Sequence, residues 1–222
     1  MQTKIILVRH GQSIGNAWRR YLGHTDLGLT DVGRREAEQT AKALAEEMVK
    51  IGKNNGRNMA AIITDMNTPL GNNIGNSLEV IEAIEILKGK GAEDLKYVAK
   101  ALASEIVSLS KNIPVTEAEN LVSNAIKSGK ALEKFKEWIS HQGGNVDWIE
   151  NPDLFPKAEF KEEIKAENDC YISSMNAEEI GISSVILGAG REKKDDAIDM
   201  TAGIILNKKT AGECNSRRKS FQ

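Results

Sequence analysis

The feature that most constrains this chain is a short apolar run, residues 5–8 (IILV), that ends abruptly in Arg9-His10-Gly11. An apolar run of this length stopped by a glycine predicts a buried strand. Arg9 and His10 would then lie at its carboxyl end, where open α/β sheets bind their ligands. A histidine ring nitrogen can attack a phosphoryl group, and an arginine can hold the phosphate oxygens in a fork. The alternatives are that His10 only packs at the end of a strand, or that it is a remnant of a phosphate-binding pocket.

Composition excludes several classes of function. The chain has 222 residues, a formal net charge of −2 and 5% aromatic residues, so we expect no nucleic-acid partner. Cys170 and Cys214 are too few for a disulfide framework and lack the spacing of a metal site. The sequence contains no signal peptide and no apolar stretch long enough to span a membrane. We therefore expect a cytoplasmic protein of one or two domains without a membrane partner.

Apolar periodicity predicts a helix and a second strand after this motif. Thr30 or Asp31 can cap a helix over residues 31–51, and Gly52 is expected to end it. Residues 60–64 (AAIIT) have the pattern of a buried strand. Because strand, helix and strand in this order favour a right-handed parallel crossover, we expect this strand to lie parallel to the first.

Helical patterns dominate the next hundred residues. Residues 78–87 and 95–109 each carry an apolar stripe at helical spacing, and Thr116 with Glu119 resembles a capping box before a third helix. Glycines and prolines then punctuate residues 145–157. Four later segments have the pattern of short strands: 159–166, 170–175, 184–187 and 203–206. The predicted fold class is α/β, with parallel-sheet strands and flanking helices, followed by a small α+β C-terminal module.

The N-terminal motif resembles a known family. RHGQS at residues 9–13, with Asn16, Gly23, Asp26 and LTDVG at residues 29–33, is similar to the histidine phosphatase family, which includes the cofactor-dependent phosphoglycerate mutases. The resemblance covers about the first forty residues.

This resemblance implies a phosphohistidine chemistry acting on a phosphomonoester. The implied catalytic residues are His10 and Arg9, and the implied phosphate-binding residues are Arg9, Asn16 and Gly23. The family also uses a second histidine, a second arginine and an acid. His24 and His141, the other histidines of the chain, do not occupy the matching position, so we expect any such activity to be weak.

Most of the remaining chain resembles a different family. The motifs are TDMN (64–67), PLG (69–71), LEVIEAI (78–84), LKGKG (87–91), HQGGN (141–145), ENPDLFPKA (150–158) and GAGREKKDDAID (188–199). In this order they resemble the pyrimidine-nucleoside and thymidine phosphorylases, over about residues 42–210. The resemblance implies a glycosyltransferase that cleaves a pyrimidine nucleoside with inorganic phosphate, giving the free base and a pentose 1-phosphate.

The second resemblance also implies a potassium ion. Backbone carbonyls at Leu70 and Asn73 and the carboxylate of Glu82 match the family's ligands. Oxygen ligands suit a hard cation. Glu82 lies four residues after Leu78 on the predicted helix and is expected to face the PLG loop. The alternative is that Glu82 is a solvated residue on an outer helix face.

Together the resemblances predict a chimera with three parts. These are a phosphatase-like fragment (1–41), a phosphorylase-like α/β segment (42–150) and a phosphorylase C-terminal-like module (151–222). The family's phosphate loop and base-binding residues lie upstream of TDMN, where this chain has the phosphatase-like part, so we expect impaired phosphorolysis. The alternatives are a phosphohydrolase or phosphomutase using His10, or an inactive chimeric or truncated protein. The sequence does not indicate an oligomeric state.

Overall fold

The computed structural model describes residues 30–64, 66, 68–191, 193–209 and 213–214. The chain divides into two compact units, residues 1–64 and 65–222. The predicted site residues Arg9, His10, Asn16 and Gly23 lie outside the described residues. The three-part organisation expected from the two resemblances remains a prediction.

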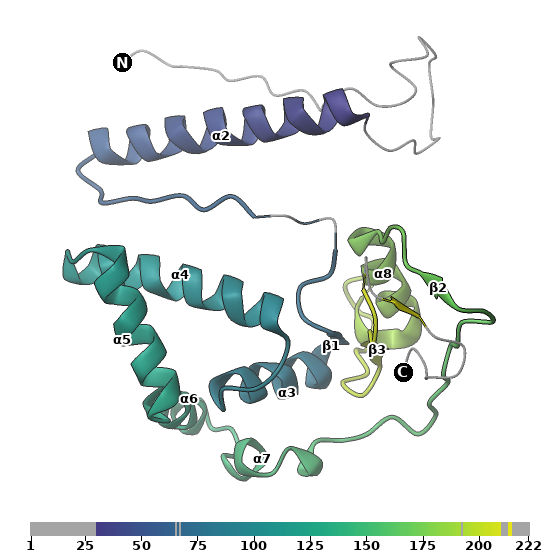
Figure 1. Cartoon of the computed structure of the whole chain (residues 1–222). Coiled ribbons are helices and arrows are strands. Elements are labelled where there is room, and N and C mark those ends of the chain that lie inside the picture. Colours follow the sequence, from purple (N-terminus) through teal and green to yellow (C-terminus); the bar gives the residue numbers. More distant parts are fainter. Residues whose placement is uncertain (1–29, 65, 67, 192, 210–212, 215–222) are drawn as a thin grey trace. The chain divides into compact units, whose positions relative to one another are not determined.

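Among the described residues of the first unit, helix α2, Asp31–Asn54, is the principal element (Figure 1). The hydroxyl oxygen of Thr30 accepts a hydrogen bond from the Gly33 amide at 3.0 Å, which confirms the predicted N-cap. The predicted end at Gly52 is wrong, because the helix continues to Asn54. Gly52 is buried, and the Met59 side chain lies where a Cβ would project. This glycine therefore permits close packing and does not terminate the helix.

Residues 60–64 were expected to form a buried strand, and this prediction is wrong. The segment belongs to no strand and is exposed, with Ile62 at 39% and Ile63 at 55%. An apolar run forms a strand only when another strand takes up its backbone N–H and C=O groups. The expected partner, residues 4–8, lies outside the described residues, so a parallel sheet there remains untested.

The second unit is mostly helical, with short strands. Its elements in chain order are β1 (Asn73–Gly75), α3 (Asn76–Leu87), α4 (Glu93–Lys111), α5 (Val115–Lys127), α6 (Lys130–His141), α7 (Asp147–Glu150), the 3₁₀ helix η1 (Pro152–Leu154), β2 (Cys170–Tyr171), α8 (Ala177–Ser184), the π-helix η2 (Val185–Ala189), β3 (Gly203–Ile205) and β4 (Glu213–Cys214). The helices predicted over 78–87 and 95–109 are confirmed as α3 and α4.

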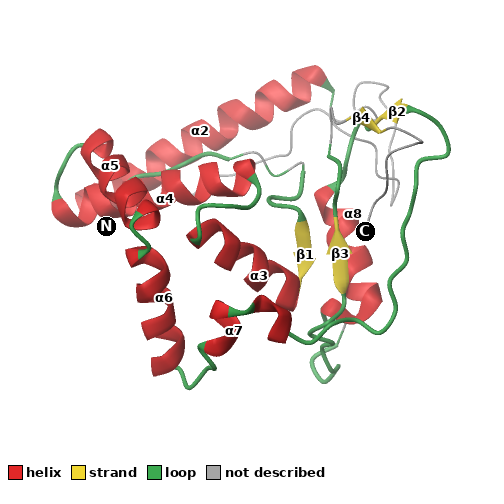
Figure 2. Cartoon of the chain, turned by 60° about the horizontal axis from the view of Figure 1, so that its bottom comes forward, coloured by secondary structure: helices red, strands yellow, loops and turns green. Residues whose placement is uncertain are grey.

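Each strand pair of the second unit is antiparallel. Strands β1 and β3 lie side by side (Figure 2), with Asn73 opposite Ile205 and Gly75 opposite Gly203. Strands β2 and β4 form another pair. The fold therefore combines helices with small sheets, and none of the strand pairs in the described ranges is parallel.

Several local predictions for this unit are wrong. Helix α5 begins at Val115 after Pro114, so Thr116 lies inside its first turn and does not cap it. Residues 184–187 lie in α8 and η2, because Asn176 caps that helix through two amide hydrogen bonds, at 3.0 and 3.3 Å. Residues 159–166 form no strand, and the strand expected over 170–175 is only Cys170–Tyr171. The strand expected at 203–206 is confirmed as β3.

Buried apolar side chains of the second unit come from several elements, among them α3, α5 and α7. Ile84 and Ala118 are fully buried and Ile149 is 3% exposed. Ser104 of α4 is 1% exposed and donates to the Lys100 carbonyl at 2.7 Å, so a small side chain with no unsatisfied hydroxyl faces the interior. Within the described ranges, no helix combines the length and apolarity needed to cross a bilayer.

Candidate functional site

The best-defined polar site in the second unit is the loop that leads into β1, residues 69–73 (PLGNN). Glu82, on α3, is 7% exposed and points at this loop. Its carboxylate accepts hydrogen bonds from the Asn72 amide, at 2.9 and 3.2 Å, and from the Asn73 amide, at 3.2 Å. The prediction that Glu82 faces the PLG loop is confirmed. The alternative, a solvated helix-face residue, is wrong.

The sequence of the loop explains this close approach. Gly71 has a φ of +75°, a conformation that side chains disfavour. A Cβ at Gly71 would lie 3.1 Å from the Glu82 carboxyl carbon and 3.2 Å from a Leu95 methyl group. Glycine therefore supplies both the turn and the space for the buried carboxylate. The Asn73 side chain closes the far end of the loop by donating to the Leu78 carbonyl at 3.2 Å.

A second charged group holds the other side of the loop. The ammonium of Lys209 donates to the Pro69 carbonyl at 2.9 Å and to the Asp94 carboxylate at 2.6 Å. The same Asp94 oxygen lies 3.4 Å from the Gly71 amide. Burial by itself raises the pKa of Asp94, but the hydrogen bonds from Lys209 and from the Leu95 and Gly71 amides, with the Lys209 charge, lower it below its ordinary value.

Three successive amides of the loop thus face carboxylates. Gly71 points at Asp94, and Asn72 and Asn73 point at Glu82. Successive N–H groups of this kind form a concave site for an anion. Here the protein's own carboxylates fill it, so the loop is held by internal charges.

The donor set at this loop is compatible with a monovalent cation. The Glu82 carboxylate has about four lone-pair positions. The Asn72 and Asn73 amides together make three contacts with it, and the described residues leave one position for a cation. Backbone carbonyls such as those of Leu70 and Asn73 can replace the hydration shell of potassium. Among the described residues no group of three or more His, Cys, Asp or Glu side chains gathers as a metal site, but a carbonyl-based site does not need one.

Sequence reasoning found Glu82 and missed Asp94 and Lys209. Asp94 lies in the first turn of α4, where acidic residues are common because they interact favourably with the positive end of the helix dipole. Its position in the sequence therefore does not indicate another role. Lys209 is one of two adjacent lysines after β3. A separation of 115 residues hides their pairing from any local pattern.

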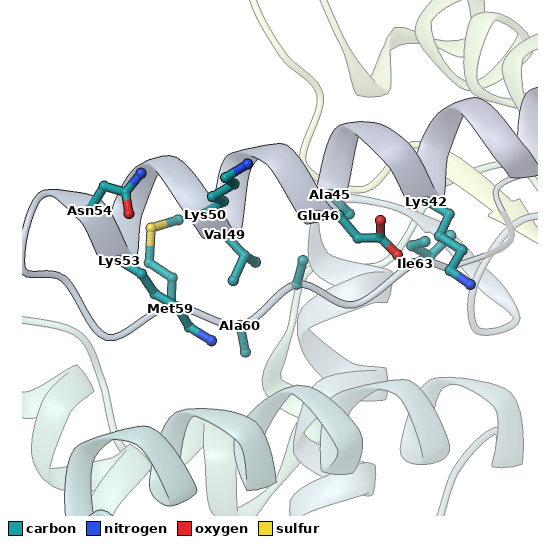
Figure 3. Close-up of a pocket in the computed structure, with 11 residues that line it drawn as sticks. Lys42, Ala45, Glu46, Val49, Lys50, Lys53, Asn54, Met59, Ala60 and Ile63 are labelled. Atoms are coloured by element: carbon teal, nitrogen blue, oxygen red, sulfur yellow. The ribbon is translucent and has the colours of Figure 1, made fainter.

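The first unit contains a groove of about 660 Å³ between α2 and residues 59–63 (Figure 3). Apolar side chains, including Val49, Met59 and Ile63, and the ammonium-bearing Lys42, Lys50 and Lys53 line it. Among the described residues, those that line this groove include none of the predicted potassium ligands Leu70, Asn73 and Glu82.

Comparisons with known proteins agree with the two resemblances. Residues 5–52 match the family model of the histidine phosphatase superfamily (branch 1). Residues 171–215 match that of the pyrimidine nucleoside phosphorylase C-terminal domain. The chain therefore contains one segment similar to each family. The two resemblances stated from the motifs are therefore confirmed.

Curated relatives of the chain include pyrimidine-nucleoside phosphorylases of staphylococci. One from Staphylococcus epidermidis is 49% identical over 170 residues, covering 76% of this chain and 39% of the relative. Those from Staphylococcus haemolyticus and Staphylococcus aureus are 48% identical over 172 residues, covering 77% of this chain and 40% of each relative. The chain thus spans about two fifths of the length of the curated relatives it matches.

Proposed function

We propose that this chain acts on pyrimidine nucleosides by phosphorolysis, at a rate well below that of the phosphorylases it resembles. The observation that carries the proposal is the buried Glu82 anchoring the PLGNN loop, in a stretch close in sequence to staphylococcal pyrimidine-nucleoside phosphorylases. In this reaction a phosphate oxygen bonds to the anomeric carbon of the pentose. The carbon–nitrogen bond breaks, and its electron pair leaves with the base, which takes up a proton.

The low rate of phosphorolysis is expected because the first sixty residues lack the groups that the reaction needs. Phosphorolysis needs donors placed around the phosphate and the departing base, and removing one such group can cost roughly 10²–10³-fold. Residues 1–60 contain no glycine- and serine-rich phosphate loop, and residues 5–52 match a different family. We infer that the chain joins segments of two families and that this junction weakens phosphorolysis.

The direct test is release of uracil from uridine by the purified chain, with and without inorganic phosphate. We expect slow release that depends on phosphate and falls further in Glu82→Gln. The matched control is Glu79→Gln, because Glu79 lies on the same helix and accepts a 3.0 Å bond from the Gly75 amide at an exposed position. Absence of phosphate-dependent release at high protein concentration would contradict the activity. A rate equal to that of a staphylococcal phosphorylase would contradict the impairment.

A potassium ion at the PLGNN loop belongs to this proposal. Leu70 and Asn73 would hold it through backbone carbonyls, and Glu82 through its remaining carboxylate position. When bound, the ion supplies positive charge that offsets the buried carboxylate. We expect KCl to raise the melting temperature more than NaCl or choline chloride at equal ionic strength, and Glu82→Gln to abolish the difference. Equal melting temperatures in the three salts would contradict a potassium site.

Phosphomonoester hydrolysis at His10 is the second candidate, favoured by the histidine phosphatase match over residues 5–52. The family uses a second histidine and an acid that this chain does not match. Proton transfer by such groups accelerates a reaction roughly 10²–10⁴-fold, so the rate of hydrolysis should be lower by about that factor. We expect slow hydrolysis of an aryl phosphate that His10→Ala abolishes and His141→Ala preserves. His141, at the end of α6, is a suitable control because its side chain is 77% exposed. Equal rates in wild type and His10→Ala would exclude this function.

A further inference from the structure

We propose that Lys209 is a positioning residue for the PLGNN loop, through which the segment after β3 holds the loop in place. This role goes beyond the proposed function, because it depends only on the geometry of the second unit. Lys209 follows β3 by four residues, and its ammonium reaches the Pro69 carbonyl at 2.9 Å. The contact joins residues that are 140 positions apart in the sequence.

The surroundings of Lys209 distinguish it from an ordinary surface ion pair. Exposed pairs contribute little to stability because solvent screens them and both side chains lose freedom. The Lys209 side chain is only 21% exposed, and its partner Asp94 is 45% exposed. Its ammonium also binds a backbone carbonyl of the loop, and charge-assisted hydrogen bonds of this kind are stronger than neutral ones. Lys209 therefore fixes a point on the backbone in addition to neutralising a carboxylate.

Asp94 links Lys209 to a second point of the loop, the Gly71 amide. One Asp94 oxygen accepts from Lys209 at 2.6 Å and lies 3.4 Å from the Gly71 amide. Without the ammonium, Asp94 loses the group that orients it toward Gly71. A change at Lys209 therefore reaches the loop both directly at Pro69 and indirectly at Gly71.

The loop is held on two sides by different parts of the chain. Glu82 of α3 binds the amides of Asn72 and Asn73. The segment from β3 to Lys209 supplies the opposite side, since the Leu206 amide donates to the Asn72 carbonyl at 2.7 Å. Residues 203–209 thus contact the loop at Pro69, Asn72 and Asn73. Loss of Lys209 removes one of these two sides, so the loop should open more often, and the amide contacts to Glu82 should break during each opening.

Amide hydrogen exchange of the whole chain, followed by mass spectrometry, tests this directly. In Lys209→Met we expect the amides of residues 71–73 to exchange roughly tenfold faster than in wild type, because a charge-assisted hydrogen bond to the loop is lost. Lys209→Arg keeps a cationic donor and should restore most of the protection. Exchange in α5 and α6 should stay unchanged in both variants, since these helices do not depend on the loop.

The matched control is Lys96→Met. Lys96 also makes a 2.6 Å ion pair in the first turns of α4, with Glu93, but that pair does not bind the loop. Unchanged exchange at residues 71–73 in Lys209→Met, or equal acceleration in Lys96→Met, would overturn the proposal. If Lys209→Met does not fold, the same exchange measurement on Asp94→Asn tests the proposal. This variant removes the charge partner of Lys209 and keeps Lys209 itself. Faster exchange confined to the loop in that variant supports the proposal, and wild-type exchange contradicts it.

Discussion

Gly75 and Gly203 lie directly opposite each other in the β1–β3 pair, and their backbones approach more closely than side chains would permit. A Cβ on Gly75 would lie 2.6 Å from the Ala202 carbonyl oxygen and 2.9 Å from the Gly203 Cα. A Cβ on Gly203 would lie 2.8 Å from a Leu78 methyl group and would clash with the Ile74 carbonyl. This pair of glycines lets β3 reach the start of α3 and brings Lys209 toward the loop.

Gly203→Ala should therefore destabilise the protein. Overpacking against backbone that cannot move costs about 1–3 kcal/mol. We expect the free energy of unfolding in urea to fall by about that amount. Gly181→Ala is the control, because Gly181 lies inside α8 with nothing near its missing Cβ, and alanine there should gain roughly 0.5–1 kcal/mol through helix propensity. Equal effects of the two substitutions would show that the close approach does not matter.

Glu82→Gln should destabilise the second unit by about 1–3 kcal/mol, the typical loss when buried donors lose a partner. Glutamine keeps one acceptor oxygen, but its NH₂ group would face an amide donor of the loop. Glu79→Gln, at the exposed neighbouring site, should cost less. Urea unfolding followed by circular dichroism measures both. A Glu82→Gln protein as stable as wild type would mean that the amide contacts do not hold the loop.

The sequence predicts elements that depend on local periodicity. The apolar stripes of α3 and α4 and the Thr30 cap require only neighbouring residues, and all three are confirmed. Glu82 is identified through the resemblance to the phosphorylases, and its spacing from Leu78 then predicts which face of the helix it occupies.

Predictions are wrong or missing where the structure of a segment depends on residues distant in the sequence. Residues 60–64 have a strand's composition but no described partner, and residues 184–187 become helical because Asn176 caps the segment before them. The Lys209–Asp94 pair joins positions 115 residues apart, and no local pattern contains it. Gly52 shows that a glycine can serve packing inside a helix as well as termination.

Part of the stability that the protein loses on acidification should come from Glu150. The hydrogen bond and charge of Lys136, with a smaller effect of Lys88, lower the pKa of Glu150 below its ordinary 4.5. The folded state therefore favours the carboxylate. The resulting stabilisation is present above pH 4.5 and is lost as the pH falls through the lower folded pKa.

In Glu150→Gln the melting temperature should accordingly fall less steeply as the pH is lowered. Melting temperatures of wild type and variant should differ near neutral pH and converge below the folded pKa of Glu150. Glu119→Gln, at an exposed position of α5, serves as the control and should leave the profile unchanged. A gap between wild type and Glu150→Gln that persists at the lowest pH would mean that the effect is not electrostatic.

The register of β2 with β4 predicts a specific cross-link. Cys170 and Cys214 are opposite each other in this antiparallel pair. Opposite residues have Cα atoms roughly 4.5–5.5 Å apart, within the roughly 4.4–6.8 Å that a disulfide spans. Oxidised glutathione should therefore convert the two thiols to an intramolecular disulfide and release two reduced glutathione molecules. Peptide mapping of the protein without reductant should identify a Cys170–Cys214 peptide, which Cys170→Ser removes. If glutathione adds to the cysteines without linking them, the pairing of Cys170 with Cys214 in the β2–β4 register would have to be revised.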